Sequence, residues 1–163
     1  MTAVSNAGPL IHLAKIGRLS LLKEIFNEII IPRTVKIEVI NRGKERGEPD
    51  ALLFDNIDWI KVVNDPANVD QLVRRVGIHR GELCAIFLAK TLNVPVLLDD
   101  SDARKFALAL GLEVVGSIGV IIRAIKLGLI SKEEGLKDLE RLAKVMWLSI
   151  DVYEKARKVI ESL

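Results

Sequence analysis

The chain has 163 residues, which fits one domain with a substantial hydrophobic core. Half of the residues are hydrophobic but only 4% are aromatic, so aliphatic side chains build that core, and RNA binding by rows of exposed stacking rings is disfavoured. The net charge of +2 falls short of the strongly basic balance of an electrostatic nucleic-acid binder. Two local basic groups are interpreted as solvated helix faces: Arg74, Arg75, His79 and Arg80, and Arg42, Lys44 and Arg46.

The single cysteine, Cys84, stands in an apolar run, so we expect a small buried side chain and no internal disulfide. No cysteine–histidine spacing of a zinc site is present. No apolar stretch is long enough to span a membrane, and no basic segment followed by an apolar one opens the chain. We therefore expect a cytoplasmic protein without a membrane partner.

The hydrophobic pattern predicts strands and helices that alternate along most of the chain. In chain order these are a strand over 2–5, helices over 8–16 and 18–26, a strand over 28–32, a helix over 34–41, a strand over 60–63, a helix over 79–93, a strand over 95–98, a helix over 101–110, a strand over 113–115, and helices over 118–127, 132–145 and 151–162. Thr34 is expected to cap the third helix, and the polar residues 41–50 to form a loop.

The strands are apolar on both faces and separated by helices, which predicts a three-layer α/β fold with a central parallel sheet flanked by helices. Residues 1–130 form the predicted core, and residues 131–163 a C-terminal helical extension packed on the same domain. Ligands of such open sheets bind at the carboxyl ends of the strands. The polar residues at those ends are therefore the candidates for function.

Five such residues stand at or near the predicted edge. Asn6 ends the first strand, Asp99 and Asp100 end the strand over 95–98, Glu82 lies in the first turn of the helix before that strand, and Glu38 lies on the helix after Pro32. Taken singly, each has an ordinary structural interpretation as a turn, cap or helix-surface residue. Two carboxylates about 4 Å apart, however, repel by about 4 kcal/mol at an effective dielectric near 20. The adjacent pair therefore indicates a divalent cation such as Mg²⁺.

Rival catalytic motifs are absent: there is no phosphate-binding loop, no dinucleotide-binding glycine pattern and no serine nucleophile elbow. The two histidines, His12 and His79, are far apart in the sequence. His12 is interpreted as a partly buried histidine with a satisfied hydrogen bond, and His79 as a polar residue at a helix start. A ribonuclease that relies on two histidines is thus poorly supported.

Four segments in order resemble the PIN-domain family, in a prokaryotic DUF3368-like branch allied to VapC-type toxins. They are 4–17 (VSNAGPLIHLAKIG), 81–89 (GELCAIFLA), 97–104 (LLDDSDAR) and the pair 111–112 and 116–120 (GL and GSIGV). The resemblance implies a Rossmann-like PIN fold and an endoribonuclease that depends on Mg²⁺ or Mn²⁺. It implies that the catalytic residues are Asn6, Glu38, Glu82 and Asp100, with Asp99 as a further metal ligand and Asp100 ranked above it.

The chain departs from the family pattern at Asn6, where most active PIN nucleases have aspartate. An amide oxygen can ligate a cation but brings no charge, so the expected metal affinity is lower. Arg80, Arg104 and Lys105 lie beside the acidic motifs and could contact RNA phosphates, although surface solvation is the preferred interpretation of each.

The resulting hypothesis is a metal-dependent endoribonuclease, the toxin of a toxin–antitoxin pair, with RNA and an antitoxin as partners and a homodimeric state. A second hypothesis, favoured by Asn6, is a PIN fold that binds RNA or a partner with weak or no cleavage. A third is an interaction protein that dimerises through its tail helices. The sequence leaves open the RNA target, the choice between Mg²⁺ and Mn²⁺, and the existence of an antitoxin.

Overall fold

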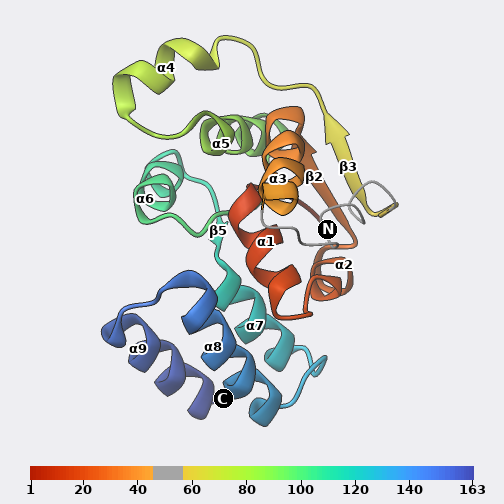
Figure 1. The fold of residues 1–163 in the computed structure, drawn as a ribbon, viewed down its shortest axis with the longest axis vertical. Helices are drawn as coiled ribbons and strands as arrows, with labels where there is room; N and C mark the ends of the chain where they lie inside the picture. The colour runs from red at the N-terminus through yellow and green to blue at the C-terminus, as the bar shows by residue number, and fades with distance from the viewer. Residues whose placement is uncertain (46–56) are drawn as a thin grey trace.

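The structure is a computed structural model that describes residues 1–45 and 57–163 (Figure 1). Its strands are β1 (Thr2–Ser5), β2 (Glu28–Pro32), β3 (Ile60–Val63), β4 (Val96–Leu97) and β5 (Val114–Val115). Its helices are α1 (Ala7–Lys15), α2 (Ser20–Phe26), α3 (Arg33–Glu45), α4 (Val69–Val76), α5 (Arg80–Leu92), α6 (Ser101–Ala109), α7 (Ser117–Lys126), α8 (Lys132–Met146) and α9 (Ile150–Glu161).

The five strands form one parallel sheet in the order β3-β2-β1-β4-β5. β1 occupies the centre, where Val4 is level with Ile30 of β2 and with Val96 of β4. Parallel pairing brings the carboxyl ends of β1 and β4 to the same edge. The predicted three-layer α/β fold with a central parallel sheet is therefore confirmed.

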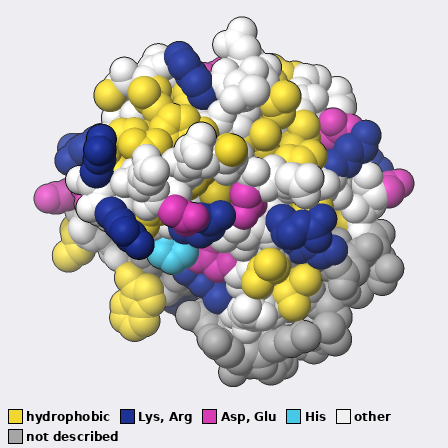
Figure 2. Space-filling view, turned by 90° about the horizontal axis from the view of Figure 1, so that it is seen from above, with side chains coloured by type: hydrophobic (Ala, Val, Ile, Leu, Met, Phe, Trp, Pro, Cys, Tyr) yellow, Lys and Arg dark blue, Asp and Glu magenta, His cyan; other side chains and the backbone are white. Residues whose placement is uncertain are grey.

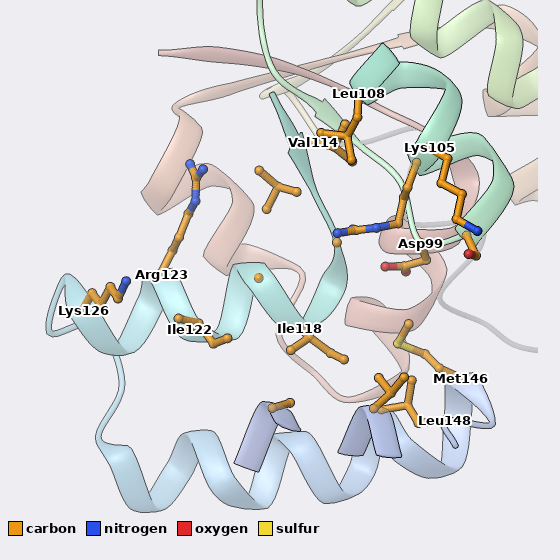
Figure 3. Close-up of a pocket in the computed structure, with 17 residues that line it drawn as sticks. Asp99, Lys105, Leu108, Val114, Ile118, Ile122, Arg123, Lys126, Met146 and Leu148 are labelled. Atoms are coloured by element: carbon orange, nitrogen blue, oxygen red, sulfur yellow. The ribbon is translucent and has the colours of Figure 1, made fainter. Parts of the chain in front are cut away.

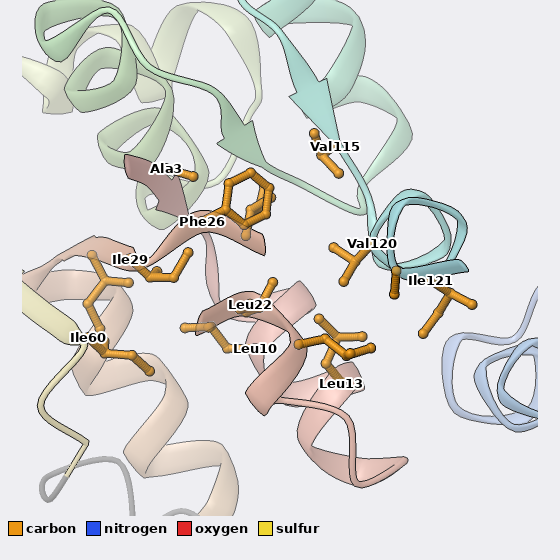
Figure 4. Close-up of a cluster of buried hydrophobic side chains, with 14 of the residues drawn as sticks. Ala3, Leu10, Leu13, Leu22, Phe26, Ile29, Ile60, Val115, Val120 and Ile121 are labelled. Carbon is orange, nitrogen blue, oxygen red and sulfur yellow. The ribbon is translucent and has the colours of Figure 1, made fainter. Parts of the chain in front are cut away.

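Neighbouring strand residues point to opposite sides of the sheet, and the residues on both sides are apolar. Helices therefore cover both faces. Ala3 and Leu97 belong to the core on the side of α1, α2, α3 and α7, whereas Val4 and Val96 belong to the core under α4, α5 and α6. Figure 4 shows the first core, in which leucines of α1 and α2 and Phe26 meet α7. The low aromatic content is thus reflected in aliphatic packing.

Cys84 lies on α5 in the second core and is fully buried, as expected. Burial is the main reason why the pKa of its thiol is raised to about 11. The thiol is therefore uncharged at neutral pH and packs as a small apolar group.

The structure corrects two sequence-based predictions in the second quarter of the chain. Helix α3 runs on to Glu45, so the predicted loop over 41–50 is wrong in its first part, and its part beyond 45 lies outside the described residues. Thr34 does not supply the cap of α3: Asp65, from the loop after β3, accepts hydrogen bonds from the Thr34 backbone N–H (3.0 Å) and hydroxyl. A side chain distant in sequence has taken the capping role.

Helix α4 was not predicted, although its apolar residues recur at the spacing of one helix face: Val69, Leu72, Val73 and Val76. The helix is short and carries exposed Arg74 and Arg75, in line with their interpretation as a solvated helix face. Arg80, at the start of α5, forms ion pairs with Asp65 and Asp70 and so joins this helix to the sheet edge.

The C-terminal helix α8 packs on α7, and α9 packs on α8 (Figure 1). Ser131 and Glu134 form a capping box that starts α8. The buried Asp138 accepts a 2.8 Å hydrogen bond from Arg18, which lies between α1 and α2 and thus ties α8 to the sheet layer. Within residues 1–45 and 57–163, no helix has the length and apolar character needed to cross a bilayer.

Candidate active site

The sheet order explains why residues distant in sequence meet at one edge. Asn6 follows β1, and its backbone N–H donates to the Leu97 carbonyl of β4 at 3.0 Å. Asp99 and Asp100 follow β4 directly. Because β1 and β4 are neighbours, the three polar residues emerge side by side at the carboxyl ends of the strands.

Two helices bring the remaining predicted acids to the same place. Glu38 lies in the middle of α3 and Glu82 in the first turn of α5. All five predicted residues line one pocket of about 450 Å³, together with Gly8, His12, Arg42, His79, Ser101 and Met146. Figure 2 shows a face on which acidic side chains and a histidine lie together, with Lys and Arg side chains around them.

Two oxygen atoms of this pocket are buried without a hydrogen-bond partner: Asn6 Oδ1 and Glu38 Oε2. Both adjoin Gly81, where a Cβ atom would lie 2.9 Å from Glu38 Oε2 and 3.6 Å from Asn6 Oδ1. Burying an unpaired carboxylate oxygen is costly. The arrangement therefore suits a ligand that supplies positive charge or a hydrogen-bond donor.

Negative charge is concentrated around these oxygens. The pKa of Glu82 is raised, first by burial and then by the neighbouring carboxylate of Asp100, and Glu38 adds to the effect. Arg42 offsets part of the charge, because its guanidinium lies 3.0 Å from the other carboxylate oxygen of Glu38. A carboxylate cluster whose charged forms disfavour one another gains stability from a cation.

The adjacent aspartates differ in what holds them. Asp99 accepts from the Ser117 backbone N–H (2.7 Å), the Ser117 hydroxyl (2.6 Å) and His12 Nδ1 (2.7 Å), so both its oxygens are engaged. Asp100 uses one oxygen to cap α6 through Ala103 N–H (3.0 Å) and is otherwise exposed to solvent. Asp100 thus retains an oxygen for a ligand, whereas Asp99 is held in a fixed position.

Comparison with known proteins identifies the family of the chain. The family model of DUF3368, a PIN domain, matches residues 2–162, which is nearly the whole chain. The chain belongs to the PIN-domain family. The predicted family is confirmed, and with it a nuclease fold that typically uses divalent metals.

A solved structure, a PilT N-terminus domain protein from the hyperthermophilic archaeon Sulfolobus solfataricus, is similar to this PIN domain at 15% identity. The alignment covers 74% of this chain and 90% of the archaeal one, with a TM-score of 0.46. No curated protein is significantly similar to the chain.

The residues of the pocket fit a hard divalent cation by their chemistry. Asn6 and Glu38 present unpartnered buried oxygens, and Glu82 and Asp100 line the same pocket. Within the described part of the chain, no three His, Cys, Asp or Glu side chains stand close enough to hold an ion by themselves. A bound Mg²⁺ would therefore take one or two carboxylates directly and keep several waters, which is its usual coordination in proteins.

The three basic residues considered for phosphate contact are in different places. Arg80 does not line the pocket, since its guanidinium pairs with Asp65 and Asp70. Arg104 and Lys105 line a second groove that shares Asp99, Ser101 and Met146 with the acidic pocket. Arg104 also donates to the Leu98 carbonyl at 3.0 Å, which fixes its side chain beside the sheet edge.

Sequence reasoning did not identify three residues that shape this site. Arg42 was assigned to a solvated face, although its i,i+4 spacing from Glu38 on one helix could have indicated the ion pair. His12 has the satisfied hydrogen bond that was expected, but its partner Asp99 was not foreseen. Ser117 follows β5, and only the observed neighbourhood of β4 and β5 places it against Asp99.

Proposed function

We propose that this PIN domain is a divalent-metal-dependent endoribonuclease. The observation that supports it most directly is the pair of unpartnered buried oxygens of Asn6 and Glu38, in a pocket that Glu82 and Asp100 also line. A divalent cation bound there would lower the pKa of a bound water and stabilise charge on the phosphate under attack.

The side chains of the chain itself would orient the reactants. Glu38, Glu82 and Asp100, with Asn6 as a neutral ligand, would hold the cation directly or through its waters. Asp99 is a positioning residue in this proposal, since His12 and Ser117 engage both its oxygens. Arg42 keeps Glu38 in its orientation and reduces the repulsion among the acids.

The decisive experiment is cleavage of an end-labelled RNA with Mg²⁺, Mn²⁺ or EDTA. Wild type is compared with Asp100→Asn and Glu82→Gln, all purified identically, and with Asp102→Asn as a matched control on an exposed acid that does not line the pocket. We expect metal-dependent cleavage that both pocket variants abolish and the control retains. Equal activity in all four proteins would mean contamination and would refute the proposal.

A second candidate function is a PIN-fold module that binds RNA or a protein partner without cleaving. Asn6 favours it, because the amide brings no charge to the site. RNA binding would then survive EDTA, and no product would appear with either metal.

We further propose that the nuclease is a VapC-like toxin with an antitoxin partner and acts as a homodimer. The family assignment supports a nuclease but does not distinguish this branch. Growth arrest on expression, relieved by a small protein encoded next to it, would support the toxin role. Light scattering of the purified chain tests the dimer.

A further inference from the structure

The short connection between α8 and α9 carries an unusual residue. The side chain of Trp147 is 91% exposed, and no other aromatic ring in residues 1–45 and 57–163 is as open to solvent. Its backbone has a φ of 54°, in the left-handed region. A helix end of this kind normally uses glycine or asparagine, since a bulky side chain there costs energy.

The backbone on both sides of Trp147 is fixed. The Leu148 N–H donates to the Ala143 carbonyl at 3.1 Å and closes the end of α8. Ser149 caps α9 by accepting from Val152 N–H at 3.2 Å. Two well-formed helix ends therefore fix the backbone from which the indole projects.

The connection that carries this ring borders the candidate active site, although the ring itself lines neither hollow. Met146 lines both the acidic pocket and the neighbouring groove, and Leu148 lines the groove. The groove has a volume of about 790 Å³ and runs between α6, β5, α7 and the α8–α9 connection. Figure 3 shows Asp99 and Met146 at one end of it and Arg123 and Lys126 at the other.

Aliphatic side chains make up most of the groove's lining, and basic residues outnumber acidic ones among its charged residues. Four basic residues line it, Arg104, Lys105, Arg123 and Lys126, against a single acid, Asp99. Arg123 is paired with Glu113, but Lys105 and Lys126 form no ion pair with any residue that the structure describes. Phosphates attract such cations irrespective of sequence, and an exposed indole offers a stacking surface to any unpaired base.

We propose that Trp147 stacks on an unpaired base of single-stranded RNA, whose phosphates follow the groove past Lys105 toward the acidic pocket. The inference rests on the proposed nuclease function and adds a residue that positions the substrate. The bases of a duplex are already stacked and paired, so they would not be available to the ring. Trp147 would be a substrate-positioning residue at the rim of the site. A second copy of the chain is the rival occupant of this rim, but the positive groove favours a polyanion.

RNA binding without turnover tests the inference directly. A short fluorescently labelled single-stranded RNA is titrated in EDTA with wild type, Trp147→Ala, Trp147→Phe, Trp147→Gly and Ile150→Ala, the last being a matched apolar side chain that is 81% exposed. We expect Trp147→Ala and Trp147→Gly to weaken binding about tenfold, Trp147→Phe to retain most of it, and Ile150→Ala to bind like wild type. Glycine suits the left-handed backbone, so loss of binding in that variant cannot be ascribed to unfolding.

Fluorescence provides a second readout. The chain has two tryptophans, so Trp59→Phe leaves Trp147 as the single indole. Single-stranded RNA should quench its emission, and duplex RNA of the same sequence should quench it much less. Quenching that depends on protein concentration alone, with a dimer in light scattering, would assign the rim to a second copy and overturn the inference.

Cleavage assays separate this inference from the proposed function. If wild type and Trp147→Ala cleave single-stranded RNA with the same KM, the stacking role is wrong and the nuclease proposal stands. If no metal supports cleavage but Trp147→Ala still binds RNA more weakly, the nuclease proposal is wrong and the stacking role stands.

Discussion

At the scale of single residues, Gly81 makes room for the site. The Cβ atom of any other residue at position 81 would lie only 2.9 Å from Glu38 Oε2, closer than real Cβ contacts. Gly8, on α1, faces the same pocket, but a Cβ atom there would meet its nearest neighbours at an ordinary 3.7–3.8 Å. The two glycines therefore provide a matched pair of tests.

We expect Gly81→Ala to displace Glu38 and to reduce metal-dependent cleavage at least about tenfold, since about 1 Å of misplacement costs up to two orders of magnitude in rate. Gly8→Ala should retain activity. Both changes raise helix propensity, so neither should lower the melting temperature by much. Equal activities of the two variants would show that the position of Glu38 does not matter.

Asn6→Asp changes the charge of the site and little else. A second buried carboxylate beside Glu38 should lower thermal stability without metal, because the like charges repel. Mg²⁺ or Mn²⁺ should then raise the melting temperature more than in wild type, as measured by differential scanning fluorimetry. A metal-induced shift no larger than that of wild type would remove Asn6 from the ligand set.

The sequence allowed the strand-end residues to be predicted, because Asn6 and Asp100 follow apolar runs at the edge where ligands of parallel sheets bind. It could not indicate that Asp99 is held by His12 and Ser117, since those hydrogen bonds span 87 and 18 residues of sequence and depend on strand order. The ranking of Asp100 over Asp99 stays a prediction, which the remaining free oxygen of Asp100 supports.

At the scale of secondary structure elements, Asp65 joins three helices. It caps α3 through Thr34 and pairs with Arg80 at the start of α5, whose other partner, Asp70, is on α4. Burial opposes ionisation of Asp65, but the hydrogen bonds from Thr34 and the charge of Arg80 outweigh it and lower its pKa. Its contribution to stability is therefore complete above its unfolded pKa and is lost as the pH falls through the lower folded value.

Asp65→Ala should lower the free energy of unfolding at neutral pH by about 1 kcal/mol, the typical cost of a lost helix cap. The difference from wild type should shrink below about pH 4, where the carboxylate begins to protonate. Urea unfolding at several pH values measures it. Asp70→Ala is the control, because that 80% exposed partner of Arg80 should contribute little. A pH-independent difference would contradict the charge-based account.

The same elements show why sequence patterns located most segments and missed one. Long helices have strong periodicity and buried strands are continuous apolar runs, whereas α4 has only two turns and sits among charged residues. Its apolar spacing was present and could have been used. The cap of α3 could not have been found, because the partner is 31 residues away.

At the scale of the whole molecule, Gly135 brings the C-terminal helices against the rest of the chain. A Cβ atom there would collide with the Cδ1 and Cγ1 atoms of Ile125, so α8 packs on α7 more closely than any other residue would permit. Gly135→Ala should lower the free energy of unfolding by about 1–3 kcal/mol through overpacking, despite its higher helix propensity.

Ile125→Val removes the Cδ1 atom and should restore part of that loss in the double variant. Thermal unfolding of the two single variants and the double variant gives the coupling energy. Strictly additive effects would show that α7 and α8 are not in tight contact at this point.

The overall topology could be predicted because a parallel α/β fold follows from apolar strands that alternate with helices, and both the fold and the PIN family are confirmed. The division at residue 130 stays a prediction. The buried pair of Asp138 with Arg18 could not be foreseen, since a charged residue on an amphipathic helix is expected to face water.

The thiol of Cys84 can report how often the core of the molecule opens. The chain has one thiol, which lies on the buried face of α5, and its high pKa keeps it unreactive while the fold is closed. The rate at which a thiol reagent modifies Cys84 therefore measures how often the core around it opens. Added Mg²⁺, RNA or a protein partner that binds the closed form should slow this rate, so binding could be followed without any engineered label.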